Sequence, residues 1–199
     1  MIVDEWGTWY DVEPGTEPGF LYQQSTMRDA VAAALNFHIF HRHADRVVMA
    51  NIAQTVNVLQ AVLLTDDTRI VLTPTYHVME MYTVHHDAVA LPLDVHNTTY
   101  TLGASSLPAV HASASRDRNG AIHLSLVNIN PNSAQDVPVD VRGMSCTSVS
   151  GSVSEVIDSV STGASAGFTF AYTGGAGRSA GKSEPPALIA ACTSCSATS

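Results

Sequence analysis

The stretch HADRVVMANI, residues 43–52, decides the fold class of the N-terminal part of the chain. Its second half, residues 47–52, is an apolar run without alternation, which is typical of a strand buried on both faces of a sheet. Before it a helix is predicted, because apolar residues recur at helical spacing at Met27, Ala30, Val31, Ala34, Leu35 and Ile39. Thr26 and Asp29 have the spacing of a capping box at the start of that helix. Residues 2–6, IVDEW, are a further short strand, so the order strand, helix, strand predicts a parallel pair with a right-handed crossover.

The pattern changes along the rest of the chain. Thr73 and Pro74 begin a second predicted helix, since proline suits the first helical position, whereas residues 60–72 fit neither helix nor strand clearly. From about Val89 short alternating runs follow one another, separated by turn residues, at residues 90–95, 110–115, 122–127 and 137–141. Such a series is typical of an antiparallel β-sandwich.

Three segments follow from these changes of pattern. Residues 1–88 are expected to form an α/β unit, and residues 89–158 an all-β sandwich domain. Residues 159–199 are dominated by Ser, Gly, Ala and Thr and carry no charge between Ser159 and Gly177. We expect an atypical, poorly ordered tail there, with residues 168–172 as one further strand.

Composition and charge exclude several function classes. The 199 residues include 18 Asp+Glu against 9 Lys+Arg, a formal charge of -9, so binding to nucleic acid or to an anionic membrane is not expected. The chain shows neither an apolar stretch of membrane-spanning length nor a signal peptide, which predicts a cytoplasmic protein. Its three cysteines are an odd set and cannot form a closed disulfide framework.

Glu5 is the acidic residue best placed for catalysis. It lies at the end of a predicted parallel strand and is followed by Trp6, Trp9 and Tyr10. In barrels and open α/β sheets the active groups lie at the carboxyl ends of the strands, where loops surround a substrate. Aromatic rings that pack on a sugar, beside a carboxylate that attacks the anomeric carbon, are typical of glycosidases. The alternative interpretation is a solvated acid on a frayed strand.

Several motifs occur in the order found in one enzyme family. The stretch DEWGTWY, residues 4–10, with EPGT at 13–16 and LYQQ at 21–24, resembles the nucleophile region of the α-L-arabinofuranosidases of glycoside hydrolase family 51. HADR at 43–46 and ANIAQTVNV at 50–58 resemble the next barrel strand of that family and its active-site end. The resemblance continues through TPTYH at 73–77 to about Gly151, and so covers most of the chain.

The resemblance implies both a fold and a function. The family has a TIM (β/α)8 barrel followed by a jelly-roll-like β-sandwich, so this chain would hold the C-terminal remnant of the barrel and the sandwich. The family cleaves terminal α-L-arabinofuranosyl residues from arabinose-containing saccharides with retention of configuration. The resemblance implies no metal or organic cofactor, and it implies a homo-oligomer, commonly a hexamer, for the full-length parent.

The resemblance also implies roles for individual residues. Glu5 matches the nucleophile, which forms a covalent arabinosyl intermediate. Trp9 matches a residue that lines the sugar pocket, and Gln54 matches a polar side chain that reaches the bound sugar from the next strand. Tyr10 and Asn57 lie in the same motifs and are expected to support the site.

One group that the family requires has no match in the chain. A retaining glycosidase needs two carboxyl groups about 5 Å apart, and in this family the acid/base lies on an earlier barrel strand, upstream of Met1. After about Ser154 the sequence also stops resembling the family. We therefore expect a C-terminal fragment with no more than trace hydrolase activity by itself. The alternative is a non-catalytic β-sandwich module that acts in carbohydrate binding or assembly.

Overall fold

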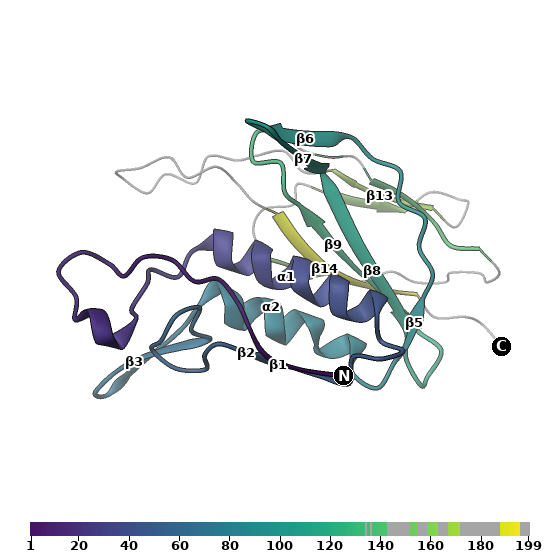
Figure 1. Ribbon diagram of the computed structural model, residues 1–199. Helices are drawn as coiled ribbons and strands as arrows, with labels where there is room; N and C mark the ends of the chain where they lie inside the picture. The colour runs from purple at the N-terminus through teal and green to yellow at the C-terminus, as the bar shows by residue number, and fades with distance from the viewer. Residues whose placement is uncertain are drawn as a thin grey trace. The chain divides into compact units, whose positions relative to one another are not determined.

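The computed structural model describes residues 1–133, 135 and 137–142, together with the backbone of four later strands. The chain divides into two compact units, Met1–Thr83 and Val84–Ser199. Figure 1 traces the elements of both units in chain order. The predicted site residues all belong to the first unit, so its architecture positions the candidate site.

The first unit begins with two parallel strands that are joined through a helix (Figure 1). Strand β1 (Ile2–Trp6) pairs with β2 (Met49–Ile52), and the register places Trp6 opposite Ile52 at the carboxyl ends. The connection contains the 3-10 turn η1 (Pro18–Phe20) and helix α1 (Met27–Arg42). The predicted parallel pair with a helix between its strands is therefore confirmed.

Hydrogen bonds within one turn define where the helices begin. The predicted capping box of α1 is present, and the Asp29 carboxylate accepts the N–H of Thr26 at 2.8 Å. Helix α2 (Pro74–Tyr82) begins after Thr73, whose hydroxyl accepts the N–H of Tyr76 at 3.3 Å. Both helix starts were predictable because these bonds join residues only three positions apart.

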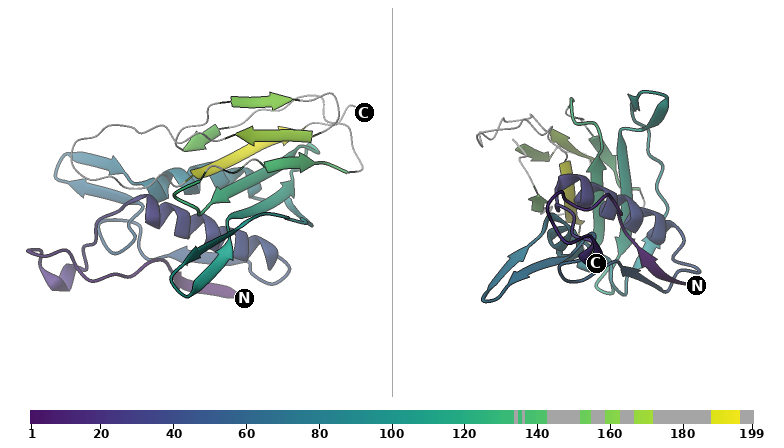
Figure 2. Two further views of the ribbon diagram at one scale, coloured as in Figure 1. Left: turned by 90° about the horizontal axis from the view of Figure 1, so that it is seen from above. Right: turned by 60° about the vertical axis from the view of Figure 1, so that its left-hand side comes forward.

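The ambiguous segment between β2 and α2 forms a hairpin. Strand β3 (Leu63–Asp66) pairs antiparallel with β4 (Arg69–Leu72), and Leu63 lies opposite Leu72. Figure 2 shows this hairpin extending away from the two helices of the unit. All four residues of β4 are exposed, so no buried face imposes an alternating pattern on the sequence.

The expected burial of residues 47–52 on both faces is wrong. Val48 is 77% exposed and Met49 is 53% exposed. Within the described residues the sheet consists of β1 and β2 alone, so much of its surface remains open to solvent. Trp6 is buried because its ring packs edge-on against Phe37 and Phe40 of α1, with centroids 5.3 and 5.5 Å apart.

The second unit consists mostly of antiparallel strands. One sheet of five strands has the order β11-β14-β9-β8-β5, and one of three strands has the order β10-β13-β12. A separate pair, β6 and β7, forms an exposed hairpin, and the 3-10 turn η2 precedes β5. The bounds are η2 (Thr83–His85), β5 (Val89–Leu91), β6 (Thr99–Leu102), β7 (Ser105–Pro108), β8 (Val110–Arg116), β9 (Ile122–Asn128), β10 (Val137–Asp140), β11 (Ser152–Ser154), β12 (Ser159–Thr162), β13 (Gly167–Ala171) and β14 (Leu188–Cys195).

Apolar side chains of the two larger sheets meet in one core, as in a β-sandwich. The buried cluster comes from neighbouring strands β8 and β9, and strand β10 of the other sheet packs against it. The cluster is Val110, Ala114, Leu124 and Leu126, and the residues of β10 that pack on it are Val137 and Val139. The strands expected at 110–115, 122–127 and 137–141 are therefore confirmed.

Two other expectations differ from the observed strands. The strand expected at residues 90–95 ends at Leu91, because Pro92 has no N–H with which to continue the ladder. The β6–β7 hairpin was not expected, since its strands are almost wholly exposed and lack an apolar face. The structure divides the chain between Thr83 and Val84. The predicted domain boundaries after residues 88 and 158 stay a prediction.

The expected tail, residues 159–199, falls largely outside the described residues. Its described parts are the strands β12, β13 and β14, and β13 (Gly167–Ala171) overlaps the strand expected at residues 168–172. The expectation of poor order for the rest of the tail stays a prediction.

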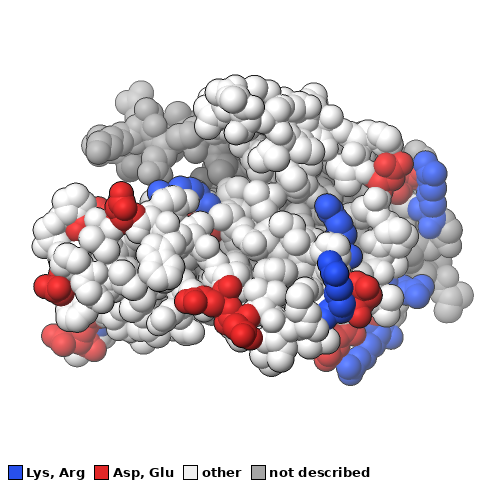
Figure 3. Space-filling view, in the orientation of Figure 1, with Lys and Arg blue, Asp and Glu red and all other residues white. Residues whose placement is uncertain are grey.

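Surface charges are often found in pairs of opposite sign. The face drawn in Figure 3 is mostly uncharged, and in several places acidic and basic side chains lie next to one another. Arg118 contacts Asp87 at 3.2 Å, and Arg142 contacts Asp140 at 2.9 Å. In the part of the chain that the structure describes, neither helix is both long and apolar enough to cross a membrane.

Candidate active site

The two motifs that hold the predicted site residues lie side by side at the carboxyl ends of β1 and β2. The N–H of Ala53 donates to the carbonyl oxygen of Trp6 at 2.8 Å, directly beyond the last paired residues. Glu5 precedes Trp6 and Gln54 follows Ala53, and both side chains are exposed. The peptide bond between Ala53 and Gln54 is cis. The pairing thus places Glu5, near the end of β1, and Gln54, two residues beyond β2, at the same end of the sheet.

Gly7 allows these two loops to approach closely. Its φ is +144°, a backbone conformation that residues other than glycine rarely adopt. A Cβ atom at this position would lie 3.3 Å from the carbonyl oxygen of Ala53 and 3.3 Å from Oε1 of Gln60. A glycine is therefore needed where the chain leaves β1 and passes against the segment after β2.

The loop after Gly7 presents two aromatic rings to solvent. Trp9 is 64% exposed, and Tyr10 is 39% exposed. The guanidinium carbon of Arg28, at the start of α1, lies 3.6 Å from the centre of the Tyr10 ring, which is a cation–π contact. An exposed indole close in sequence to an exposed carboxylate can offer an apolar face and a nucleophile to the same small polar ligand.

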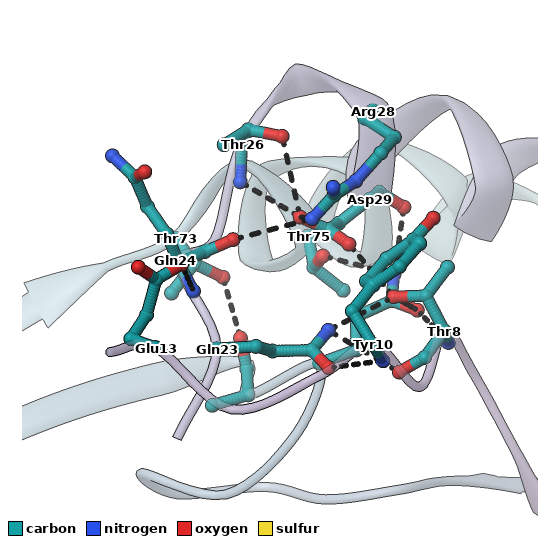
Figure 4. Close-up of polar contacts among 12 residues, drawn as sticks. Thr8, Tyr10, Glu13, Gln23, Gln24, Thr26, Arg28, Asp29, Thr73 and Thr75 are labelled. Atoms are coloured by element: carbon teal, nitrogen blue, oxygen red, sulfur yellow. Dashed lines mark hydrogen bonds and ion pairs between the residues drawn. The ribbon is translucent and has the colours of Figure 1, made fainter. Parts of the chain in front are cut away.

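A buried polar network lies beneath this loop (Figure 4). Oδ1 of Asp29 accepts the hydroxyl of Thr8 at 2.7 Å, and Oε1 of Gln60 accepts the N–H of Thr8 at 2.8 Å. The amide nitrogen of Gln60 donates to the carbonyl oxygen of Asp29 at 2.6 Å and to the Thr75 hydroxyl at 3.2 Å. Asp29 and Thr75 are 0% exposed and Gln60 is 1% exposed, so these three side chains are shielded from water, whereas Thr8 is half-buried.

A second buried amide holds the same loop from the other side. Oε1 of Gln23 accepts the N–H of Tyr10 at 3.0 Å, and its Nε2 donates to the carbonyl oxygen of Thr8 at 3.2 Å. Gln23 is 3% exposed. The backbone on both sides of Trp9 is therefore bonded to side chains that come from distant parts of the chain.

The segment after β2 is held mainly by backbone bonds. The N–H of Gln54 donates to the carbonyl oxygen of Val58 at 3.3 Å, and Gln54 is exposed. Asn57 has a φ of 59°, and its side chain bonds to the β3–β4 hairpin. It accepts the N–H of Thr65 at 2.8 Å and donates to the Thr65 hydroxyl at 3.0 Å. Asn57 thus fixes the hairpin to the loop.

Four residues of the network were not predicted as part of the site: Thr8, Gln23, Asp29 and Gln60. Asp29 was assigned to the helix cap, and Gln60 lies in the segment without a clear pattern. Their shared signal in the sequence is weak, because isolated polar residues in loops are usually exposed. Among the described residues, no group of three or more His, Cys, Asp or Glu side chains is arranged to hold a metal ion.

Comparisons with known proteins give a consistent result. A family model described as the alpha-L-arabinofuranosidase C-terminal domain matches residues 4–164. An intracellular exo-alpha-L-arabinofuranosidase from Bacteroides ovatus is 49% identical over 142 residues, which are 71% of this chain and 28% of that protein.

Solved structures with the same fold are also found. The GH51 arabinofuranosidase from Xanthomonas axonopodis pv. citri superposes with a TM-score of 0.78 at 38% identity, over 98% of this chain and 41% of that one. A family 51 alpha-L-arabinofuranosidase from Bifidobacterium longum gives a TM-score of 0.76 at 19% identity, again over 98% and 41%, and shows the fold alone. The chain thus spans less than half the length of each of these relatives.

Proposed function

The chain belongs to the α-L-arabinofuranosidases of glycoside hydrolase family 51, of which it is a C-terminal portion, and we propose that it supplies the nucleophile side of that active site. The observation that carries the proposal is the register of β1 and β2, which puts Glu5 and Gln54 at the same end of a parallel pair. The exposed indole of Trp9 extends from the loop that follows Glu5. The substrate class is a saccharide with terminal α-L-arabinofuranosyl residues.

The first unit is proposed to be the last part of a (β/α)8 barrel. Its parallel strands joined through α1, followed by α2, have the order of elements that such a barrel repeats. In barrel enzymes the active groups come from the carboxyl ends of the strands, where Glu5 and Gln54 lie. The second unit is proposed to be the jelly-roll-like sandwich that follows the barrel.

Glu5 is proposed to act as the nucleophile in a double displacement. Its carboxylate attacks the anomeric carbon while the glycosidic oxygen leaves with a proton, and an arabinosyl ester of Glu5 forms. Water then attacks the same carbon from the face of the departing leaving group, which regenerates the carboxylate and retains the configuration. Trp9 is proposed to pack on the sugar, and Gln54 to bond to its hydroxyl groups. Tyr10 and Asn57 support the two loops.

A second carboxyl group must protonate the leaving oxygen and later deprotonate water. Asp29, the most buried carboxylate of the first unit, is committed to Thr8 and Thr26 and is not accessible to a substrate. We propose that the acid/base comes from a barrel segment other than the residues matched here, so that this chain acts only together with that segment. The assembled enzyme is proposed to be an intracellular homo-oligomer, as the name of the Bacteroides ovatus relative suggests for its location.

The first test is hydrolysis of 4-nitrophenyl α-L-arabinofuranoside by the purified chain, with Glu5→Gln beside it. Trace activity at most is expected from the chain alone. The second test uses a chimaera in which the matched residues of this chain replace those of the Bacteroides ovatus enzyme. The chimaera should be active, and Glu5→Gln should lower kcat by at least about 1000-fold, whereas the neighbouring change Asp4→Asn should not.

Azide distinguishes a nucleophile from other essential carboxylates. In a Glu5→Ala chimaera a small anion fits where the carboxylate was, and it attacks the same face of the sugar. We expect azide to restore turnover of an activated aryl substrate and to give the β-configured arabinosyl azide. An α-configured product, or full activity of Glu5→Gln, would refute the role of Glu5. An inactive chimaera that folds normally would favour the non-catalytic alternative.

A further inference from the structure

Trp9 combines an exposed side chain with an unusually well anchored backbone. Its ring is 64% exposed, yet three backbone groups on either side of it are bonded to buried amide side chains. These bonds join the N–H and the carbonyl oxygen of Thr8 and the N–H of Tyr10 to Gln60 and Gln23. Exposed loops usually bond to water or to their own backbone, so this loop is held far more tightly than its exposure predicts.

The anchoring side chains are themselves fixed by further bonds. Asp29 receives the Thr8 hydroxyl at 2.7 Å on one oxygen, and the Thr26 N–H at 2.8 Å and the Arg28 guanidinium at 3.5 Å on the other. Gln60 is bonded to the backbone of Asp29 and to Thr75. Because each side chain of this network makes several hydrogen bonds at once, a change in its orientation would break at least one of them.

Burying a carboxylate completely is costly unless several donors surround it. A capping box does not require such burial, because its N3 side chain needs only the backbone N–H of the N-cap residue as a partner. The additional bond of Asp29 to Thr8 connects the start of α1 with the loop that carries Trp9. The bond of Gln60 to Thr8 connects that loop with the segment after β2, which carries Gln54.

We propose that Thr8, Gln23, Asp29 and Gln60 are positioning residues that preorganise Trp9 for the sugar. They fix the backbone of Trp9 before any ligand arrives, and they hold the loop of Trp9 in a constant relation to the segment of Gln54. Preorganisation of this kind lowers the entropy that binding must otherwise remove. The inference rests on the proposed function, because it assigns these residues to the same sugar site.

The two tryptophans of the chain make the inference measurable. A Trp6→Phe background leaves Trp9 as the single fluorophore. Trp6 is buried against Phe37 and Phe40, and its indole N–H makes no hydrogen bond within the described residues, so phenylalanine keeps an aromatic ring against α1 and removes no hydrogen bond, although it fills less volume. Time-resolved anisotropy of Trp9 then reports the amplitude of its nanosecond motion in the full chain.

The test variant in this background is Thr8→Val, which removes the hydroxyl but nearly keeps the shape of the side chain. Thr8→Val thereby removes the hydroxyl contacts with Asp29 at 2.7 Å, Gln60 at 3.1 Å and Gln23 at 3.2 Å. Thr8→Ser restores the hydroxyl. The control is Thr83→Val, which removes a threonine hydroxyl of the first unit outside the network, bonded at 2.7 Å to the carbonyl oxygen of Glu80. Urea unfolding of all variants separates a general loss of stability from a local release of Trp9.

Thr8→Val should raise the amplitude of fast Trp9 motion by more than about twofold, the difference between ordered and flexible segments. Thr8→Ser and Thr83→Val should leave the amplitude unchanged, even if Thr83→Val loses as much stability. Equal Trp9 motion in Thr8→Val and the parent, or equal release in Thr83→Val, would overturn the inference.

Titration with methyl α-L-arabinofuranoside separates this inference from the proposed function. Quenching of Trp9 that weakens several-fold in Thr8→Val, and recovers in Thr8→Ser, supports both. If the Trp6→Phe background shows no response to the saccharide, the chain by itself does not bind the sugar, and the KM of the chimaera for the aryl substrate, which Thr8→Val should raise several-fold, then tests the sugar contact. The anisotropy still decides whether the network positions Trp9. A saccharide affinity unaffected by Thr8→Val would overturn the assignment of the network to sugar binding.

Discussion

Replacement of Gly7 by alanine should destabilise the first unit strongly, because this position combines two costs. The φ of +144° is unfavourable for any residue with a side chain, which costs about 1–3 kcal/mol. The new methyl group would also lie 3.3 Å from the backbone oxygen of Ala53 and 3.3 Å from Oε1 of the buried Gln60. Neither neighbour is free to move, because Ala53 is bonded to β1 and Gln60 to Thr8. We expect a total loss of about 2–4 kcal/mol of unfolding free energy.

Two other glycines of the same unit separate these costs. Gly15 has a φ of +86°, and an added Cβ meets no atom within 4 Å, so Gly15→Ala has only the backbone cost. We expect about 1–2 kcal/mol for that change. Gly19 has no positive φ, and its Cβ would lie 3.6 Å from the flexible carboxylate of Glu17. Gly19→Ala should therefore be neutral or slightly stabilising, by less than about 1 kcal/mol.

The assay is urea unfolding followed by circular dichroism at 222 nm, since both α-helices, α1 and α2, belong to the first unit. With a slope of about 1–3 kcal/mol/M, the expected loss in Gly7→Ala lowers the midpoint by roughly 1–2 M. The midpoint of Gly15→Ala should fall by less, and that of Gly19→Ala should hardly change. A midpoint of Gly7→Ala equal to that of Gly15→Ala would refute the argument from close approach.

Three further predictions concern single side chains. The hydrogen bond from His123 lowers the pKa of Asp117 below its usual 3.8. The ionised Asp117 therefore stabilises the folded state above that value, and this stabilisation is lost as the pH falls through the lower folded pKa. In urea unfolding, Asp117→Asn should therefore show a smaller fall in unfolding free energy between about pH 5 and about pH 3. Asn57→Gly and Asn57→Ala both lose the hydrogen bonds to Thr65, but only glycine tolerates the φ of 59° without cost. Asn57→Ala should therefore be less stable than Asn57→Gly by about 1 kcal/mol in urea unfolding, and equal midpoints would contradict this. The side chain of Asn97 makes two hydrogen bonds of 3.1 Å to the backbone of Val110 in β8. Asn97→Ala should lower the unfolding free energy by about 1–3 kcal/mol and speed amide hydrogen exchange in β8. Asn97→Asp keeps the acceptor and should lower the unfolding free energy by less.

The secondary structure near the site was largely predictable because its signals are local. The capping pair of Thr26 and Asp29 and the proline at the start of α2 act within one helical turn, and the structure contains both helix starts. The parallel pairing of β1 and β2 was predictable from the order of elements, since two parallel strands need a crossover connection and a helix is the usual one.

The burial of these elements was less predictable. Residues 47–52 are as apolar as a strand buried on both faces, but Val48 and Met49 are exposed in this chain. An apolar run shows that both faces of a strand can be buried, but whether they are buried depends on which other segments pack against the strand. Exposed hairpins such as β3–β4 and β6–β7 were missed for the opposite reason, because no buried face imposes a period on them.

The sequence by itself determined the helix starts, the main strands, the family and the order in which Glu5, Trp9 and Gln54 occur. Only the tertiary structure decided that Asp29 is buried and that Gln60 bonds to a residue 52 positions away. The physical reason is that periodicity and capping arise from neighbours in sequence, which a pattern records. A polar network arises when loops from different elements meet, and each polar side chain in it looks, in sequence, like an ordinary exposed residue.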